Sequence, residues 1–517
     1  MTDPFQQALK LLPEYLGWHV LLSASALLLG LAISLPMAIA AVRSPRLRWP
    51  VLAGAGLIQT IPSLALLALF FPLLLAASRL AEALFGQGFS ALGFLPSLLA
   101  LTLYSMLPIL RTATTGLLGV DPAVREAADG VGMTPGQRLL RVELPLAMPV
   151  IMAGVRTAAV WTIGAATLST PVGQTSLGNY IFSGLQTENW VFVLFGCAAS
   201  AVLAIVADQL LGLIEAGAAR RDRRRISAGL AGLALGVAVA VAPLVAGGKP
   251  AAYVVGAKNF SEQYVLAELI AGRLERGGAQ VRRKEDLGSA VAYRALAAGE
   301  IDVYVDYSGT LWSNVLGRTD NPGRAVVLSE LTKQLQARDG VVVLGSLGFE
   351  NAYAFAMKRD RAEDLGVADL AGLARAAPHL KLGSDLEFLS RPEWKAVDAA
   401  YGLKFQSRRS YQPTFMYRAL GGGDVDVISA FSSDGRIDAD GLVVLADPKG
   451  ALPPYDAVVL VSPKRAGDRR LLATLRPLIG KIPVEAMRSA NYSVDRDRGK
   501  ITPAEAARRL EHRLGLD

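Results

Sequence analysis

The sequence predicts an N-terminal all-α domain with six membrane spans and a C-terminal α/β domain with two lobes. Three observations support this fold class. Nearly every long segment before Gly248 is apolar, whereas the composition after Lys249 is that of an ordinary soluble domain. Six apolar segments reach the ~20 residues needed to cross the hydrocarbon layer. The second half alternates apolar β runs with helical segments, which is typical of α/β folds.

The expected spans of the N-terminal half follow from the length of each apolar segment. The second and third contain Pro62, Pro72 and Pro96, and such interruptions are tolerated where neighbouring helices satisfy the freed backbone groups. The six predicted spans are 18–42, 50–76, 91–110, 149–171, 190–214 and 226–247.

Loop charge predicts how these spans are oriented. The formal net charge is +8, and before Gly248 the basic residues lie mostly in alternate loops, which favours membrane orientation over nucleic-acid binding. The opposite loops carry only Lys10 and Arg79. The N-terminus and everything after Lys249 are therefore predicted to lie outside a bacterial cytoplasmic (inner) membrane. The basic loops, predicted to be cytoplasmic, contain Arg43, Arg46 and Arg48; Arg111, Arg125, Arg138 and Arg141; and Arg220, Arg221, Arg223, Arg224 and Arg225.

Residues 1–17 are interpreted as a separate interfacial segment, because apolar residues recur there at helical spacing. Pro13 is expected to kink or end that helix. Simple packing of the same residues against the bundle is an alternative. The apolar residues are Phe5, Leu9, Leu12 and Leu16.

The longest cytoplasmic loop, within 121–148, reads "EAADGVGMTPGQRLLRVELP" from Glu126 to Pro145. Helix formers come first, Gly132 and Pro135 predict a break, and a second short helical run is expected to end at Pro145. Such a helix–turn–helix suits a structural elbow or a DNA-binding hairpin. A recognition helix between two membrane spans is implausible.

This loop resembles the coupling loop of ABC-importer permeases. The family pattern is Glu-Ala-Ala, three residues, Gly, nine residues, an aliphatic residue, any residue and Leu-Pro. The resemblance implies that the loop docks on an ATPase subunit, with Glu126 as an exposed contact and Gly132 as the tight turn. The matching residues are Glu126, Ala127, Ala128, Gly132, Val142, Leu144 and Pro145.

The chain contains no GxxxxGK[ST] motif, since "AGGKPAAY" has Pro250 after the lysine. The ATPase is therefore expected to be a separate polypeptide, present in two copies beside a permease homodimer. No cofactor is expected in this chain. The three histidines are scattered and offer no catalytic constellation, so an enzyme is not predicted. Cys197 is the one cysteine, which excludes an intramolecular disulfide.

The C-terminal domain, 251–517, follows the sixth span and a short linker within 226–250. Strands are expected in "AYVVGA", "AQVRRKE" and "IDVYVDY" and near 341–345, 380–384, 425–431 and 458–462, around mostly parallel sheets. About 270 residues favour two lobes over one layer. The proposed lobes are 251–351 with 462–517, and 352–461.

Several segments of this domain resemble the substrate-binding proteins of osmoprotectant importers. They include "GAKNFSEQYVLAELIAGRLE", "GEIDVYVDYSGTLW", "ENAYAFAM", "EFLSRPEW", "DVISAFSSDGRI" and "LPPYDAVVL", in family order. The resemblance implies a two-lobed periplasmic-binding-protein clamp that closes on a quaternary-ammonium ligand. Such a cation donates no hydrogen bond, so aromatic faces hold it at ~0.5–2 kcal/mol per contact.

Position by position, the family's aromatic cage falls on Tyr307, Tyr353, Phe431 and Tyr455. The family usually has tyrosine where this chain has Phe431. The resemblance also implies that a ligand carboxylate meets Arg391, Thr310 and Lys258, since the planar guanidinium of arginine grips a carboxylate through two parallel bonds. Each residue has a structural alternative: tyrosines at strand ends often pack, and Arg391 has Glu387 and Glu393 beside it.

Tyr304 lies in the same stretch as Tyr307, but strand alternation predicts that it points to the opposite face. Glu387 would suit a ligand with an imidazole N–H, such as ergothioneine, beside the options choline, glycine betaine and carnitine. The sequence therefore predicts a permease fused to a substrate-binding subunit. The alternative is a ligand-gated channel or sensor, which leaves the coupling loop unexplained and lacks a cytoplasmic output domain.

Overall fold

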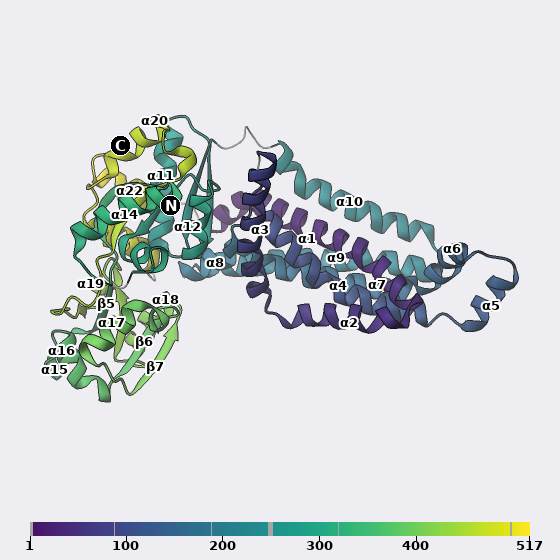
Figure 1. The fold of residues 1–517 in the computed structure, drawn as a ribbon, viewed down its shortest axis with the longest axis horizontal. Coiled ribbons are helices and arrows are strands. Elements are labelled where there is room, and N and C mark those ends of the chain that lie inside the picture. The colour runs from purple at the N-terminus through teal and green to yellow at the C-terminus, as the bar shows by residue number, and fades with distance from the viewer. Residues whose placement is uncertain are drawn as a thin grey trace. The chain divides into compact units, whose positions relative to one another are not determined.

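The computed structural model describes residues 4–86, 88–187, 189–246, 252–318, 320–496 and 499–516. The chain divides into two compact units (Figure 1). The helical unit comprises the described residues up to Gly184 and from Trp190 to Ala246. The other unit, called the α/β unit, comprises the described residues from Ala252 onward together with those of Leu185–Asn189. Most of the predicted linker, 247–251, lies outside the described residues.

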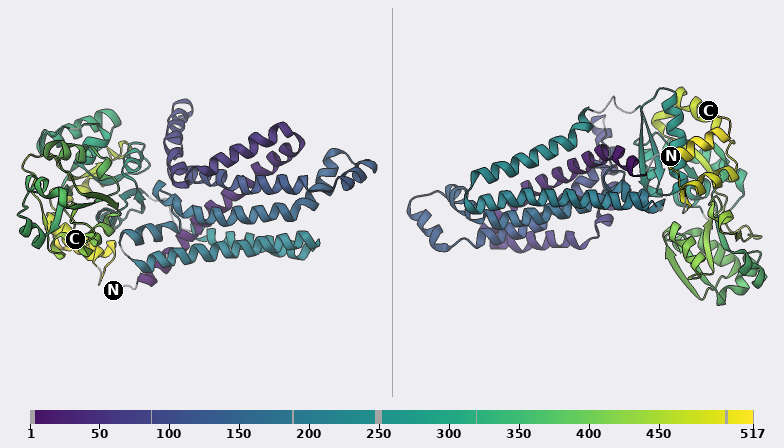
Figure 2. Two further views of the ribbon diagram at one scale, coloured as in Figure 1. Left: turned by 90° about the horizontal axis from the view of Figure 1, so that it is seen from below. Right: turned by 180° about the vertical axis from the view of Figure 1, so that it is seen from behind.

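The helical unit contains long helices joined by short connections. Figure 2 shows α1, α4, α7 and α9 running beside one another. The elements are α1 (Pro4–Arg43), α2 (Pro45–Thr60), α3 (Ser63–Phe85), α4 (Phe94–Leu118), α5 (Pro122–Gly130), α6 (Pro135–Arg138), η1 (Leu139–Glu143), α7 (Leu144–Ala166), η2 (Thr167–Val172), α8 (Gly178–Gln186), α9 (Trp190–Arg220) and α10 (Arg223–Ala246).

Glycines bring the central helices of this unit close together. A Cβ on Gly30 of α1 would lie 1.9 Å from the Ser105 Oγ of α4, and one on Gly154 of α7 would lie 1.8 Å from the Thr112 Oγ1 of α4. A Cβ at Gly154 would also lie 2.8 Å from the Pro108 carbonyl oxygen, so this position needs glycine, whereas at Gly30 the Ser105 hydroxyl would have to turn away. Small residues at helix crossings are the usual means of tight packing in a membrane, where apolar burial provides no driving force between helices.

Within the described residues, six helical segments are long and apolar enough to span a membrane. The second differs from the prediction of 50–76. The chain breaks at Ile61–Pro62, α2 ends at Thr60, and the spanning segment is α3, Ser63–Phe85. Proline explains the break, since it disfavours helical geometry in the residue before it and lacks the N–H that would continue the helix.

The prediction that residues 1–17 form a segment separate from the first span is wrong for the described residues. From Pro4 onward this segment forms the first turns of α1, which continues through Pro13. Packing against the bundle compensates for the hydrogen bond that proline removes. Ala8 is buried with Leu177, Tyr180 and Phe192, and the Tyr180 hydroxyl donates to the Ala8 carbonyl at 2.6 Å.

The α/β unit contains two five-stranded sheets. Its strands are β1 (Tyr253–Lys258), β2 (Val281–Leu287), β3 (Val303–Tyr307), β4 (Val342–Glu350), β5 (Tyr353–Lys358), β6 (Lys381–Asp385), β7 (Ser407–Tyr411), β8 (Val427–Phe431), β9 (Leu442–Val444) and β10 (Asp456–Val461).

Helices connect and cover these strands (Figure 1). They are α11 (Ser261–Arg276), α12 (Ser289–Ala297), α13 (Ser308–Thr310), η3 (Leu311–Val315), α14 (Arg324–Asp339), α15 (Arg359–Leu365), α16 (Leu370–Ala376), η4 (Ala377–His379), η5 (Phe388–Ser390), α17 (Pro392–Tyr401), α18 (Pro413–Gly422), α19 (Arg436–Ala439), η6 (Pro463–Arg465), α20 (Arg469–Leu475), η7 (Arg476–Leu478), α21 (Val484–Asp495) and α22 (Pro503–Arg513).

Both sheets are mixed rather than mostly parallel. The first has the order β2-β1-β3-β10-β4, in which β10 runs antiparallel to both β3 and β4. The second has the order β7-β6-β8-β5-β9, in which β5 runs antiparallel to β8 and β9. In each sheet the antiparallel strand is the one that the chain enters on crossing from the other lobe.

The chain crosses between the lobes twice, first between Glu350 and Tyr353 and again between Val444 and Asp456. The second crossing corrects the predicted boundary after residue 461. The whole of β10 belongs to the first lobe, because its backbone hydrogen bonds go to β3 and β4. One buried apolar cluster includes Val255 of the first sheet and Phe355 of the second.

Candidate ligand site and coupling segment

The end of β3 lies against the start of β10. The Ser308 hydroxyl donates to the Pro454 carbonyl at 2.8 Å and accepts from the Asp456 N–H at 2.9 Å. A Cβ on Gly309 would lie 2.6 Å from the Tyr455 ring, so this ring lies directly on the glycine backbone. The stretch from Tyr307 to Thr310 and Tyr455 therefore lie together, although they are about 150 residues apart.

Tyr307 is buried, and its ring stacks on Phe260 with centroids 6.1 Å apart. Its hydroxyl donates to Glu262 at 2.6 Å and accepts from Gln263 at 3.1 Å. Burial and the neighbouring Glu262 carboxylate raise the pKa of Tyr307 well above its ordinary value. The hydroxyl therefore remains a neutral hydrogen-bond donor at any physiological pH.

Lys258 also contacts Tyr307, with its Nζ 4.9 Å from the ring centroid. The same ammonium forms a buried ion pair with Asp306. Asp306 also accepts from the Tyr304 hydroxyl at 2.6 Å, so Tyr304 has a structural partner of its own. The charge of Lys258 is thus paired within the first sheet, and its contact with a ligand carboxylate stays a prediction.

Tyr353 is the centre of an aromatic cluster that comprises Tyr353, Phe388, Phe431 and Tyr455. Its ring centroid is 4.8 Å from that of Phe388, 5.1 Å from Phe431 and 5.7 Å from Tyr455. The strand register explains one contact, because Tyr353 of β5 lies opposite Phe431 of β8. Three of the four predicted cage residues therefore meet, while Tyr307 lies nearby beside Phe260.

Phe388 was not singled out from the sequence, although it lies in the quoted segment "EFLSR". An apolar residue in a short 3₁₀ turn carries no periodic signal, so only the folded chain shows that its ring is fully buried against Tyr353.

The Arg391 side chain contacts this cluster, with its guanidinium carbon 5.3 Å from the Tyr353 ring centroid. It pairs with Glu393 at 2.9 Å and with Glu387 at 3.3 Å. Burial raises the pKa of Glu393, but the bonds from Arg391 outweigh burial and hold that pKa below its ordinary value. The Glu387 side chain is 62% exposed, so it does not line a closed site.

Glu393 connects the two lobes. It accepts hydrogen bonds from the Tyr455 hydroxyl and, at 3.1 Å, from the Ser313 hydroxyl of the first lobe. Thr310 lies in α13, one residue after Gly309, and is mostly buried. Arg391 and Thr310 lie on different lobes, and their contact with a ligand carboxylate stays a prediction.

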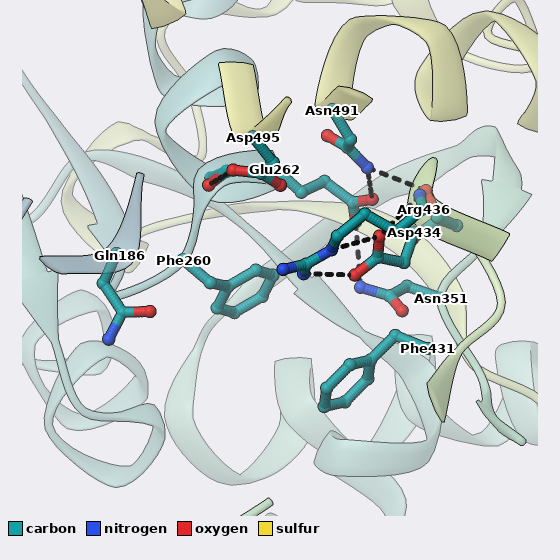
Figure 3. Close-up of a pocket in the computed structure, with 11 residues that line it drawn as sticks. Gln186, Phe260, Glu262, Asn351, Phe431, Asp434, Arg436, Asn491 and Asp495 are labelled. Carbon is teal, nitrogen blue, oxygen red and sulfur yellow. Dashed lines mark hydrogen bonds and ion pairs between the residues drawn. The ribbon is translucent and has the colours of Figure 1, made fainter. Parts of the chain in front are cut away.

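A cavity of about 90 Å³ adjoins the aromatic cluster at Phe431 (Figure 3). Glu262 is its central acceptor: it binds the Tyr307 hydroxyl and the side-chain amides of Asn351 and Asn491, at 3.2 and 2.8 Å. The described lining residues are Gln186, Phe260, Ser261, Glu262, Asn351, Phe431, Ser433, Asp434, Arg436, Asn491 and Asp495.

Burial dominates the electrostatics of this cavity. It raises the pKa of Glu262, although the surrounding hydrogen-bond donors oppose the shift. It also raises the pKa of Asp495 to about 6, against the opposing charge of Arg436. Sequence reasoning missed this group except for Phe431, because Asn491 and Asp495 come from α21, far along the chain from the quoted motifs.

The loop within 121–148, here called the coupling segment, contains α5, α6 and η1 and projects from one end of the helical unit (Figure 1). Helix α5 begins at Pro122 with its N-terminus capped by the Asp121 carboxylate, and Gly132 has φ +80°, as a tight left-handed turn requires. Glu126, Ala127 and Gly132 are exposed, whereas Ala128 is buried. An ion pair between Arg138 and Asp129 joins the two arms of the hairpin at 2.6 Å.

The second arm of this hairpin was predicted to end at Pro145, but it continues beyond that residue. It passes from α6 through a short π-helical stretch, Leu139–Glu143, into α7, and Pro145 lies in the first turn of α7. A proline in a first turn needs no N–H partner, so the helix tolerates it there. The hairpin therefore continues directly into a membrane span.

Comparison with known proteins agrees with this architecture. The family described as the substrate binding domain of ABC-type glycine betaine transport systems matches residues 251–510, and the binding-protein-dependent transport system inner membrane component matches residues 30–220. Together the two matches account for most of the chain and for both of its units.

Two curated relatives and one solved structure illustrate the similarity. The chain is 30% identical over 478 residues to the "Ergothioneine transport permease/ergothioneine binding protein EgtU" of Helicobacter pylori (strain G27), covering 89% of this chain and 82% of the relative. It is 39% identical over 197 residues to the choline transport system permease protein OpuBB of Bacillus subtilis (strain 168), covering 38% and 83%. A crystal structure of a glycine betaine/carnitine/choline ABC transporter matches with TM-score 0.46 and 26% identity, covering 51% and 99%.

Family membership favours an importer over the alternative of a ligand-gated channel or sensor, and it accounts for the coupling segment. The chain belongs to the ABC-importer family in which a multi-pass membrane permease is fused to a substrate-binding domain of the glycine betaine type.

Proposed function

We propose that this chain imports a trimethylammonium betaine or a close relative, with ergothioneine, choline, carnitine and glycine betaine as the candidate ligands. The observation that carries the proposal is the aromatic cluster around Tyr353, whose face already attracts the Arg391 guanidinium at 5.3 Å. An aromatic face that holds one organic cation suits another, and quaternary ammonium ligands are recognised in this way.

In this proposal Tyr353, Phe431 and Tyr455 form the cation cage together with Tyr307. Arg391, Thr310 and Lys258 meet the ligand carboxylate. The rings of the cluster contact one another, so the lobes must part to admit the ligand. The inter-lobe bonds of Glu393 to Ser313 and Tyr455 are the contacts to be broken.

The ligands for which the relatives are named share one chemical group. One relative that matches both units is named for ergothioneine, while permease relatives are named for choline, carnitine and glycine betaine. All of these ligands carry a trimethylammonium group, which supports the cage as the shared element of recognition.

The coupling segment is proposed to dock on a separate ATP-binding subunit, with Glu126 exposed at the contact, Ala127 and Ala128 in the same helix and Gly132 at the turn. A permease homodimer would bind two such subunits. The loop charges support an arrangement with the coupling segment in the cytoplasm and the α/β unit outside a bacterial inner membrane.

Calorimetric titration of the full chain in detergent, with each of the four candidate ligands, tests the proposal. At least one is expected to bind with a dissociation constant well below 1 mM, and a structurally matched neutral analogue of choline, 3,3-dimethylbutanol, should bind more weakly. If none of the four binds below millimolar concentration, the proposed ligand class is wrong.

A further inference from the structure

Helices α11 and α22 of the first lobe pack against each other (Figure 1) and carry a group of basic side chains. Helix α22 is amphipathic: its apolar residues are buried, whereas Arg508, Arg509 and His512 are exposed. Arg276, in the last turn of α11, is exposed as well. Together with Glu511 these four residues line a second surface cavity, here called the basic cavity.

The carboxylates of this group do not balance its guanidinium charges. Two carboxylates are each shared by two arginines, and one of them, Glu511, is only 3% exposed. Among the described ion pairs of the group, four guanidinium groups therefore share two carboxylates, and two positive charges are left without a carboxylate of their own. The pairs are Arg273–Glu511, Arg276–Glu511, Arg508–Glu505 and Arg509–Glu505.

The basic cavity has the size and the donors for an anionic group. Its volume is about 440 Å³, within the range of about 300–1,000 Å³ that is usual for ligand pockets. Arg508 and Arg509 each use one nitrogen for Glu505, and their side chains are 64% and 58% exposed. Because an arginine has five N–H donors in a planar fork, both retain donors that suit phosphate oxygens.

The position of the basic cavity on the lobe indicates where such an anion comes from. The first lobe begins at Ala252, whose N–H donates to the Gln280 carbonyl at 2.8 Å. Gln280 follows the last turn of α11, four residues after Arg276. Arg470 of α20 donates to the Gly277 carbonyl in the same turn, which adds a further exposed cation. The cations therefore gather at the end of the lobe where the chain enters it.

The chain that leads to this end of the lobe is short. Only residues 247–251 separate α10, one of the candidate membrane spans, from Ala252. Such a segment reaches at most about 20 Å even when fully extended. Since the chain belongs to a family of multi-pass permeases, the tether keeps the entry end of the first lobe within that reach of a lipid surface.

We propose that the basic cavity binds the phosphate groups of anionic phospholipids, so that α11 and α22 anchor the first lobe to the membrane surface. Anionic headgroups attract clusters of basic residues, and each arginine near the surface adds to the attraction. An anchored first lobe leaves the second lobe, which carries Tyr353, Arg391 and Phe431, as the one that moves when the clamp opens. The inference goes beyond the proposed function and holds for any imported ligand.

Hydrogen–deuterium exchange of the full chain in nanodiscs tests the anchor. Phosphatidylglycerol nanodiscs are compared with phosphatidylcholine nanodiscs, whose headgroup has the same phosphate but no net charge. Peptides from α22 and the last turn of α11 are expected to exchange at least about threefold more slowly in phosphatidylglycerol, since a bound headgroup opposes local opening. The difference should vanish at ~1 M salt, where the Debye length is ~3 Å. Equal exchange in both lipids would overturn the proposal.

Variants assign the effect to the basic cavity. Arg508→Gln combined with Arg509→Gln should abolish the lipid-dependent protection, whereas lysine at both positions keeps the charges and should retain most of it. The matched control, Arg359→Gln with Arg361→Gln, removes two exposed arginines from α15 of the second lobe and should leave the protection unchanged. An equal loss in this control would contradict the proposal, because the charge of the whole domain would then be responsible.

Each variant is measured as the difference between the two lipids, so a substitution that merely loosens α22 alters both values alike. A soluble anion is distinguished by adding millimolar glycerol 1-phosphate to the phosphatidylcholine nanodiscs. No protection of α22 is expected there. Protection equal to that in phosphatidylglycerol would make the cavity a site for soluble phosphate monoesters and would overturn the lipid anchor.

Discussion

The guanidinium of Arg391 lies 5.3 Å from the centre of the Tyr353 ring, so this aromatic face already contacts a cation that belongs to the chain itself. The same guanidinium is paired with Glu393 at 2.9 Å, and Glu393 bonds to Tyr455 and Ser313. If the aromatic cluster is the ligand site, as proposed, a ligand that enters it meets a network of bonds that joins both lobes.

Replacement of Tyr353 by leucine should weaken every quaternary-ammonium ligand to a similar degree. Loss of one cation–π contact of ~0.5–2 kcal/mol corresponds to about a 2- to 30-fold higher dissociation constant. Tyr353→Phe is the matched control, because it keeps the ring face and removes only the hydroxyl. Calorimetry on the full chain measures both. A similar loss in the phenylalanine variant would show that the hydroxyl, not the ring, is responsible.

Replacement of Arg391 by methionine should discriminate between ligands. Glycine betaine, which has a carboxylate, is expected to lose about tenfold or more in affinity, since hydrogen bonds to charged groups contribute about 1.5–3 kcal/mol. Choline has no carboxylate and should be affected much less. If both ligands weaken equally, Arg391 acts only through its ion pairs with Glu393 and Glu387.

The stability of the α/β unit should depend on pH through Asp495. Burial raises its pKa to about 6, so this carboxyl binds a proton more tightly in the folded state than in the unfolded state. The contribution of this group to the free energy of unfolding is then greatest below about pH 4. It falls by up to ~3 kcal/mol as the pH rises from about 4 to about 6, and it does not change further above that pH.

Asp495→Asn removes this titration. The charged groups that face Asp495 are Arg436, Asp434 and Lys500, and they are unchanged in the variant. Chemical denaturation at pH 4.5 and pH 7.5 is expected to show the variant gaining stability relative to the native chain as the pH rises. A difference that is independent of pH would contradict the raised pKa.

Changes in the coupling segment should separate transport from ligand binding. Gly132 has φ +80° and a Cβ there meets nothing within 4 Å, so Gly132→Ala acts on the backbone turn alone, at ~1–3 kcal/mol. Together with its ATPase in liposomes, this variant and Glu126→Ala are expected to lose at least about fivefold in ligand-stimulated ATP hydrolysis. Affinity for ligand should stay unchanged, and Val131→Ala, at an exposed residue beside the turn, is the control.

A charged group within the predicted spans should matter for the stability of the helical unit. Arg156 of α7 bonds to Asp208 and Glu215 of α9 at 2.7 and 2.8 Å. Because ions are costly in a low-dielectric surrounding, Arg156→Leu leaves two carboxylates unpaired and is expected to destabilise the chain by about 3–5 kcal/mol. Thermal unfolding in detergent measures this, with the exposed Arg79→Leu as a control that should show little change.

Local patterns were sufficient for much of the fold. Apolar length located all six spanning segments, but the second was shifted, because hydropathy does not register the break that Pro62 imposes between α2 and α3. Strand alternation located β1, β2, β3, β4, β6, β8 and β10 and missed β5, β7 and β9. It did not reveal that β10 pairs in the first sheet, because strand direction and neighbours depend on contacts between distant segments.

The predicted site residues divide in the same way. Tyr353, Phe431 and Tyr455 were named from short motifs, and their rings meet. The motifs did not show that Phe388 completes the cluster or that the Lys258 ammonium is paired with Asp306. Side-chain partners of this kind depend on how β1, β3 and η5 are positioned by the whole domain.

By itself the sequence determined that this protein has a membrane part with basic loops on one side, a coupling hairpin and an α/β clamp. Hydrophobic length, charge and short motifs are local properties that need no folding to be present. Only the tertiary structure decided which acceptors meet in the cavity beside Phe431. Asn351, from the first crossing between lobes, and Asn491, from α21, are oriented there by the buried Glu262. Hydrogen bonds between side chains act only over a few ångströms. Asn351 and Asn491, 140 residues apart in the sequence, can therefore share Glu262 only after the whole domain has packed.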